Sequence, residues 1–153
     1  MTHHRFIIII TIKHQQAKEK KECEEEKITA TIDGISYKID SYEHTTEFGN
    51  RNKDTVAEFL KDSYEGNIDE NYNLSNGYSY IFVTMTYTNN TDEQVQILRN
   101  AGAFYIINDD LERIQVFDLG VIYIDNYCTE GKENEKYHYV LGAGESVTSE
   151  VGY

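Results

Sequence analysis

The sequence predicts an all-β protein, an antiparallel sandwich of two sheets with seven or eight strands and one short inserted helix. Three observations support this prediction. Apolar and polar residues alternate in many stretches after Lys27, which is typical of half-buried strands. The stretches are short and separated by turn residues. Only residues 54–64 show the spacing of a helix. A single barrel is the alternative architecture.

Length and charge limit the domain organisation and the classes of partner. The chain has 153 residues, which is the size of one domain. Its net charge is −13, and residues 28–153 carry eight Lys or Arg against 22 Asp or Glu, a balance of −14. Such an acidic body repels phosphate backbones, so nucleic-acid binding is disfavoured. Basic ligands, cationic peptides and metal ions stay open, although an acidic surface also serves solubility alone.

Residues 1–26 form an atypical N-terminal segment, whereas residues 27–153 form the predicted domain. A cationic start, the apolar run "FIIIITI" at residues 6–12 and the downstream Cys23 are typical of a lipoprotein leader. However, Lys20, Lys21 and Glu22 stand where lipid attachment requires small apolar residues. The segment is therefore a leader remnant, a tag or an extra strand. Its apolar run is too short to span a membrane.

The first predicted hairpin covers residues 27–44. Apolar residues alternate on both sides of Asp33-Gly34. This dipeptide favours a type I′ turn, because both central positions of that turn need a positive φ. We expect one strand before the turn and a second strand after it.

The helix is predicted from "DTVAEFLKDSY", with Val56, Phe59 and Leu60 at helical spacing and Asp54 placed to cap it. We expect two or three turns. The flanking stretches "FGNRNK" and "GNIDENYNLSNG" are polar and rich in Gly and Asn. The helix is therefore expected within a long crossover between strands.

The best strand is "YSYIFVTMTYTNNT", residues 78–91. Its period of two separates an apolar set, expected to face the core, from a threonine-rich set that begins with aromatic residues and is expected to be partly covered or solvated. The core set is Ile81, Val83, Met85 and Tyr87, and the other is Tyr80, Phe82, Thr84, Thr86 and Thr88. Asn89-Asn90 tolerates left-handed backbone conformation and is expected to end the strand.

Further strands are predicted downstream at short spacing. They lie in "QVQILRN", "AFYIIND", "RIQVFDLGVIYIDNY", "KYHYVL" and "ESVTSEVGY". The turn signals between them are "NNTD", "NDDLE", "EGKENE" and "GAG". Together with the first hairpin, these segments make up the predicted sandwich.

Two stretches resemble a known family. "YSYIFVTMTYTNNTDEQ" and "YVLGAGESVTSEVGY" are similar to the central and last strands of immunoglobulin-like domains in uncharacterised lipoproteins of Gram-positive bacteria. The similarity covers about residues 27–153. It implies an immunoglobulin-like sandwich at an extracytoplasmic, usually lipid-anchored site, with lipidation at Cys23. It implies no catalytic residues. The chain departs from the family at the residues before Cys23 and stops at Tyr153, inside the predicted last strand.

Candidate sites for chemistry are few. Cys128 and His138 are ten residues apart, but carboxylates follow the cysteine and would raise rather than lower the thiol pKa. No zinc spacing is present among the histidines and cysteines. "NDD" at residues 108–110 and "NIDEN" at residues 67–71 are oxygen-rich, so weak calcium binding at Asp109 and Asp110 is one hypothesis and an ordinary turn is the other. No other cofactor is expected.

The tyrosines give the one hint of a binding surface. Tyr123, Tyr127, Tyr137 and Tyr139 fall on two successive predicted strands and their connection. If exposed together, they would form an aromatic surface suited to a protein, peptide or glycan. The competing interpretation is that they fill a core that lacks tryptophan.

We therefore expect a non-catalytic, extracytoplasmic binding domain with an unknown ligand. An enzyme that uses loop carboxylates and a structural spacer are the alternatives. A binding domain should expose an aromatic patch or an open sheet edge, an enzyme should have a deep polar pocket, and a spacer should have neither.

Overall fold

The computed structural model describes residues 29–56, 59–98, 104–107, 113–117, 121–125 and 138–153. Nine strands lie in this part of the chain, together with one 3-10 turn and one short α-helix. The all-β prediction is confirmed, with more strands than the seven or eight expected. The N-terminal segment, residues 1–26, lies outside the described residues.

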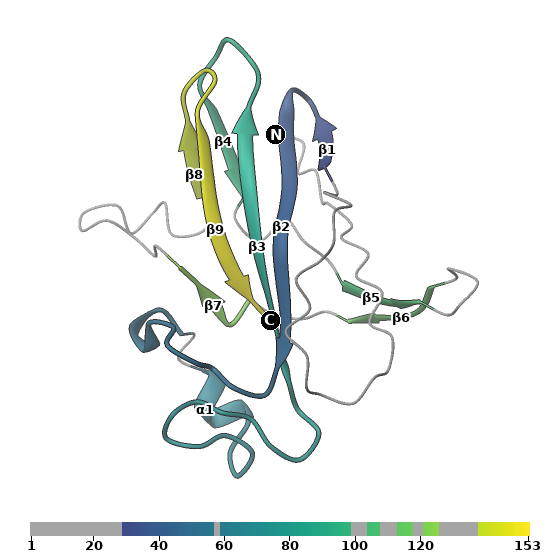
Figure 1. Ribbon diagram of the computed structural model, residues 1–153, viewed down its shortest axis with the longest axis vertical. Coiled ribbons are helices and arrows are strands. Elements are labelled where there is room, and N and C mark those ends of the chain that lie inside the picture. Colours follow the sequence, from purple (N-terminus) through teal and green to yellow (C-terminus); the bar gives the residue numbers. More distant parts are fainter. Residues whose placement is uncertain (1–28, 57–58, 99–103, 108–112, 118–120, 126–137) are drawn as a thin grey trace.

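The largest sheet has five antiparallel strands in the order β1-β2-β3-β9-β7. Its members are β1 (Thr29–Ile32), β2 (Ile35–Thr45), β3 (Tyr80–Asn89), β7 (Tyr123–Ile124) and β9 (Ser146–Gly152). A second, two-stranded sheet pairs β4 (Val95–Leu98) with β8 (His138–Leu141), and it lies behind β3 and β9 in Figure 1. A separate hairpin joins β5 (Phe104–Ile107) to β6 (Arg113–Phe117).

The main core lies between the five-stranded sheet and the β4–β8 pair. It includes Val83, Met85 and Tyr87 from β3, facing Ile97 from β4 and Leu141 from β8. Burial of such side chains stabilises the fold by roughly 1.5–3 kcal/mol each. The predicted inward face of β3 is therefore confirmed.

The opposite face of β3 carries a second, aromatic core at one end. Phe48 is fully buried there, and four rings surround it with centroids 5.5–5.9 Å away, those of Tyr72, Tyr80, Phe82 and Tyr123. Leu60 of helix α1 (Phe59–Ser63) joins this cluster. Towards the other end of β3, Thr84, Thr86 and Thr88 are half-buried, which matches the expected threonine-rich face.

The β1–β2 hairpin turns as predicted. Asp33 and Gly34 have φ of 49° and 79°, as a type I′ turn requires. A Cβ on Gly34 would lie 2.5 Å from Cγ2 of Thr91, so this glycine serves both the turn and a close contact.

The helical region differs from the prediction. The chain forms a 3-10 turn, η1 (Lys53–Thr55), and then the five-residue helix α1, instead of one helix of two or three turns. The cap of η1 is Asn52, whose side chain accepts a hydrogen bond from the amide of Asp54, so the predicted capping role of Asp54 is wrong. Val56 lies in an extended conformation and bridges to Tyr123 of β7.

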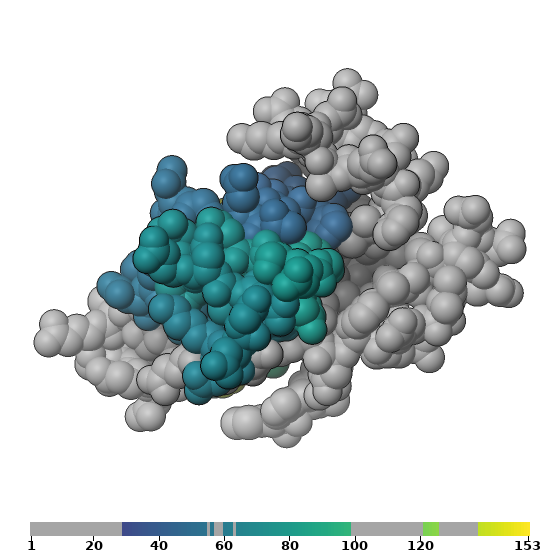
Figure 2. Space-filling model, turned by 90° about the horizontal axis from the view of Figure 1, so that it is seen from below, coloured from purple at the N-terminus to yellow at the C-terminus, as the bar shows by residue number. Residues whose placement is uncertain are grey.

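The connection that carries this helix is not a crossover. It joins β2 to β3, which are neighbouring antiparallel strands. Figure 2 shows that this connection forms the lower end face of the domain.

β3 ends at Asn89 as predicted, but not through a left-handed backbone. Neither Asn89 nor Asn90 has a positive φ. Asn89 is instead fully buried and still paired with Ile35 of β2. Its side chain, rather than a left-handed backbone, organises the turn that follows.

Candidate functional site

The predicted tyrosine surface is not formed by the two members that the structure describes. Tyr123 is 5% exposed and Tyr139 is 7% exposed, and they belong to different core clusters. Tyr127 and Tyr137 lie outside the described residues. For Tyr123 and Tyr139, the competing interpretation as core residues holds.

The other predicted site residues fall in parts of the chain that the structure does not describe. Asp109, Asp110, Cys23 and Cys128 are outside the described residues. Within the described part, no three or more His, Cys, Asp or Glu side chains come together as a metal site, and no helix there is long and apolar enough to span a membrane.

The second oxygen-rich loop, at residues 67–71, uses its carboxylate for local structure. Oδ1 of Asp69 accepts hydrogen bonds of 2.8 Å from the backbone amides of Asn71 and Asn73, and Oδ2 accepts one of 3.0 Å from the side chain of Asn73. These bonds, first of all that from the Asn73 amide, lower the pKa of Asp69. The side chain therefore holds the loop closed as an anion.

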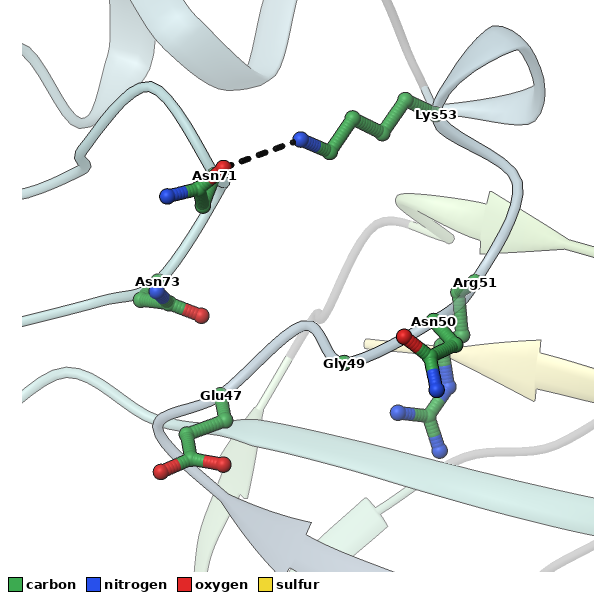
Figure 3. A pocket seen from close by; sticks show the side chains of 7 residues that line it. All are labelled: Glu47, Gly49, Asn50, Arg51, Lys53, Asn71 and Asn73. Carbon is green, nitrogen blue, oxygen red and sulfur yellow. Dashed lines mark hydrogen bonds between the residues drawn. The ribbon is translucent and has the colours of Figure 1, made fainter.

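A polar hollow of about 510 Å³ lies between the two halves of the β2–β3 connection (Figure 3). We call it the asparagine hollow. It is lined by Glu47, Gly49, Asn50, Arg51, Lys53, Asn71 and Asn73. Lys53 reaches across from one half, and its Nζ donates a hydrogen bond of 3.3 Å to Oδ1 of Asn71 on the other half.

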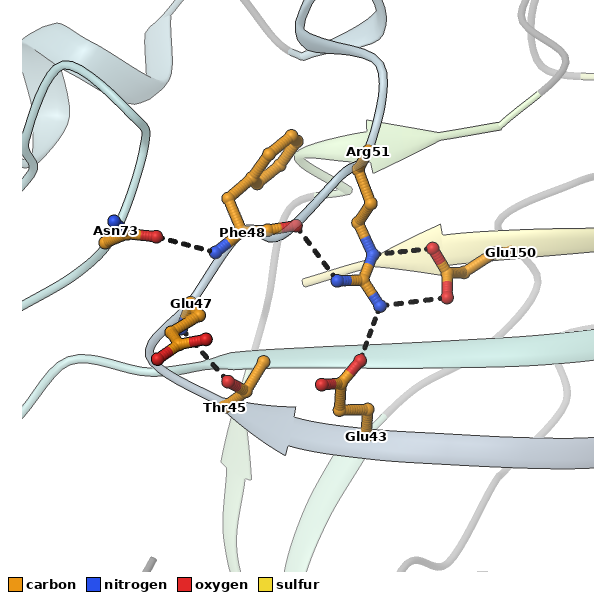
Figure 4. A network of polar contacts seen from close by, with 7 residues as sticks. All are labelled: Glu43, Thr45, Glu47, Phe48, Arg51, Asn73 and Glu150. Atoms are coloured by element: carbon orange, nitrogen blue, oxygen red, sulfur yellow. Dashed lines mark hydrogen bonds and ion pairs between the residues drawn. The ribbon is translucent and has the colours of Figure 1, made fainter. Parts of the chain in front are cut away.

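One wall is fastened to the sheet by Arg51 (Figure 4). Its guanidinium donates hydrogen bonds of 2.6 and 3.0 Å to the carboxylate of Glu150 on β9, and one of 2.7 Å to Glu43 on β2. A fourth bond, of 3.0 Å, goes to the backbone carbonyl of Phe48. The guanidinium carbon also lies 3.4 Å from the centre of the Phe82 ring, a stacked cation–π contact.

The charge on Arg51 is therefore matched by two carboxylates. Burial acts to lower the pKa of the guanidinium, but the hydrogen bonds to Glu150 and Glu43 outweigh it and raise that pKa. Arg51 stays charged and is committed to these partners. It acts as a clamp in the wall of the hollow rather than as a free cation.

The opposite wall is fastened by Asn73. Its Oδ1 accepts a hydrogen bond of 3.1 Å from the backbone amide of Phe48, and its Nδ2 binds Asp69. The backbone amide of Leu74 donates to the carbonyl of Thr46 over 2.8 Å, which ties the two halves together again. Hydrogen bonds within the protein therefore hold the backbone of both walls in place without a ligand.

Three lining side chains keep hydrogen-bonding capacity towards the solvent. Asn50 and the carboxylate of Glu47 are exposed and make no side-chain hydrogen bond within the described residues. The amide nitrogen of Asn71 is also unused there, because only its oxygen is bound by Lys53. The hollow therefore offers both donors and acceptors.

The sequence prediction missed this site. "FGNRNK" and "GNIDENYNLSNG" were interpreted as polar connections around a helix, although they supply all but one of the lining residues. The available signal was their shared richness in asparagine. The sequence does not show that Phe48 joins the two segments through Asn73, or that Arg51 fastens the first segment to the sheet.

Comparison with known proteins adds no relative: no family model matches the chain, and searches of curated proteins and of solved structures found no significant match.

Proposed function

We propose that this domain is a non-catalytic binding domain with an immunoglobulin-like sandwich fold, and that it binds its ligand at the asparagine hollow. The proposal rests on the hydrogen bonding of the residues that line the hollow. The walls are fixed by the hydrogen bonds of Arg51 and Asn73, while Asn50, Asn71 and Glu47 keep free polar groups. Polar groups on a fixed backbone pay only for ordering their own side chains on binding.

The shape of the hollow supports binding rather than catalysis. It is an open depression with one carboxylate, Glu47, in its described lining. An enzyme that works with loop carboxylates needs a pair at a defined separation. A spacer domain does not need a polar hollow between two fastened walls.

An NMR titration of the ¹⁵N-labelled domain tests this proposal. Pools of small polar compounds, sugars and short peptides should shift the amide signals of Gly49, Asn50 and Asn71, and the ligand should be recovered chemically unchanged after prolonged incubation. Conversion of the ligand would favour the enzyme alternative. If no compound shifts the signals of the hollow, the spacer alternative is favoured.

We also propose that the domain works outside the cytoplasm as part of a lipoprotein. The support is the resemblance of residues 27–153 to lipoprotein domains and the cysteine at position 23. Fractionation of cells that express the native gene, with intact mass of the recovered chain, tests this point. A membrane-bound form with a lipid mass that begins at Cys23 is expected. A cytosolic chain that begins at Met1 contradicts it.

A further inference from the structure

We infer that the ligand of the asparagine hollow is an uncharged, polyhydroxylated molecule, that is, a carbohydrate. This inference rests on the proposed function, because it names the ligand class of the same site. It follows from the hydrogen-bonding groups of the lining, from the charges around it and from its size.

The free groups of the hollow fit hydroxyls. A side-chain amide such as that of Asn50 has two donor hydrogens and an acceptor oxygen, and Glu47 adds a carboxylate that only accepts. Asn71 contributes the donor hydrogens of its unused amide nitrogen. A sugar hydroxyl both donates and accepts, so neighbouring hydroxyls can satisfy this mixture. A phosphate or sulfate, which needs donors alone, would face the Glu47 carboxylate.

The electrostatics disfavour an anionic ligand at long range and a cationic ligand only locally. Residues 28–153 carry a net charge of −14, which repels an anionic ligand at long range. Arg51 does not offset this field at the hollow, because Glu150 and Glu43 already bind its guanidinium. The ammonium group of Lys53 in the lining opposes a cationic ligand locally. A neutral polar ligand avoids both costs.

The size and openness of the hollow agree with this class. Ligand sites in proteins typically span about 300–1,000 Å³, and the hollow measures about 510 Å³. Its lining is polar, so an apolar ligand would displace bound water without replacing the lost hydrogen bonds. An open site leaves part of the ligand in water, which suits one segment of a longer glycan chain.

The test is a titration of the ¹⁵N-labelled domain with three uncharged trisaccharides, N,N′,N″-triacetylchitotriose, maltotriose and cellotriose. N-acetylneuraminate serves as an anionic sugar, and trialanine and trilysine serve as peptides. The same titrations are run on Asn50→Ala, which removes one lining amide, and on the matched control Gln94→Ala, an exposed amide outside the hollow. Because both side chains are exposed, both variants should keep the wild-type spectrum elsewhere.

We expect saturable shifts at Gly49, Asn50 and Asn71 with at least one neutral trisaccharide. Binding should weaken about fivefold to tenfold in Asn50→Ala, the effect of one lost hydrogen bond, and stay unchanged in Gln94→Ala. If only the peptides or the anionic sugar shift these signals, the carbohydrate inference is wrong and the binding function stands. If none of the probes shifts them, both proposals fail. If Asn50→Ala binds the trisaccharide as wild type does, Asn50 does not recognise hydroxyls and the carbohydrate inference is wrong.

Discussion

Arg51 and Glu150 are 99 positions apart in the chain, yet the Arg51 guanidinium donates two hydrogen bonds to the Glu150 carboxylate. Glu150 stands on β9 beside Thr84 of β3, and Arg51 lies in the β2–β3 connection. The pair therefore fastens the end of the domain that holds the asparagine hollow to the centre of the main sheet.

The first prediction concerns this pair. Arg51→Met should lower the free energy of unfolding by about 2–3 kcal/mol, because two carboxylates and a backbone carbonyl lose a charged partner. Arg51→Lys should recover only part of this loss, since one ammonium cannot reproduce the two-pronged contact with Glu150. Urea unfolding measures both changes. Lys61→Met, on an exposed lysine whose Nζ lies 4.5 Å from the centre of the Tyr72 ring, is the control and should change stability by less than about 1 kcal/mol. Equal effects of Arg51→Met and Lys61→Met would contradict the clamp.

The second prediction concerns Asn89, which joins two turns. Its Nδ2 donates to the carbonyls of Glu93, Leu141 and Gly142 at 2.7–3.2 Å, and its Oδ1 accepts from the amide and hydroxyl of Thr91. Asn89→Asp should lower the free energy of unfolding by about 3–5 kcal/mol at neutral pH. The buried carboxylate oxygen that replaces Nδ2 would face the three carbonyls and have no hydrogen to donate to them.

The pH dependence of Asn89→Asp separates this cause from simple loss of packing. Burial would raise the folded-state pKa of the new carboxyl above its unfolded value, so the added instability should shrink as the pH falls from that raised pKa to about 4, the pKa of an unfolded aspartate, and should not change below it. Urea unfolding at several pH values, relative to wild type, checks this. Asn90→Asp, on an exposed neighbour whose Nδ2 donates to Oγ of Ser36, is the control and should change stability little, because the serine hydroxyl can donate to the new carboxylate instead. A pH-independent loss in Asn89→Asp would contradict the electrostatic explanation.

Local chemistry explains which parts of the fold could be predicted from the sequence. The Asp33-Gly34 turn depends on the φ preferences of two adjacent residues. The two faces of β3 follow from alternation within one strand. Both signals are contained in a few consecutive residues, so they needed no knowledge of the rest of the chain.

The features that were predicted wrongly or missed have a common cause. Each of them depends on packing between segments that are distant in the sequence. Alternation placed Tyr123 and Tyr139 on strands but could not show that each would be covered by a different core. The helix was predicted too long because the bridge between Val56 and Tyr123 of β7 competes with helical structure there. The asparagine hollow likewise depends on distant contacts, because Phe48 joins the two segments through Asn73 and Arg51 fastens the first segment to the sheet.

The third prediction concerns Gly152, near the end of β9. A Cβ at this position would lie 2.6 and 2.8 Å from two ring carbons of Phe82 and 3.0 Å from Cβ of Tyr123. Gly152→Ala should therefore lower the free energy of unfolding by about 1–3 kcal/mol, the usual cost of overpacking a core. Gly142→Ala is the matched control, because its Cβ would meet only the flexible carboxylate end of Glu145 at 3.2 Å. Thermal unfolding of both variants measures the difference, and equal stabilities would show that the aromatic core adjusts freely.

The last prediction concerns alkaline pH. Burial first, and then the charges of Glu150 and Asp125, raise the pKa of Tyr123 to about 12, and burial raises the pKa of Tyr80 and Tyr153 as well. An unfolded tyrosine titrates near pH 10. Above that pH the unfolded chain releases protons that the folded chain still holds, so stability should fall from about pH 10 through pH 12. Below pH 10 these tyrosines should leave stability unchanged.

Urea unfolding of wild type and Tyr123→Phe at pH 8, 10, 11 and 12 tests this sign. The phenylalanine variant cannot ionise at this position, so it should lose less stability than wild type between pH 10 and 12. Tyr78→Phe, on a side chain that is 46% exposed, should follow the wild-type curve. The lysines also titrate in this range, but they are common to all three proteins and cancel in the comparison. Parallel curves for wild type and Tyr123→Phe would show that Tyr123 ionises equally easily in the folded and unfolded chain, against the buried position that it holds beside Phe48.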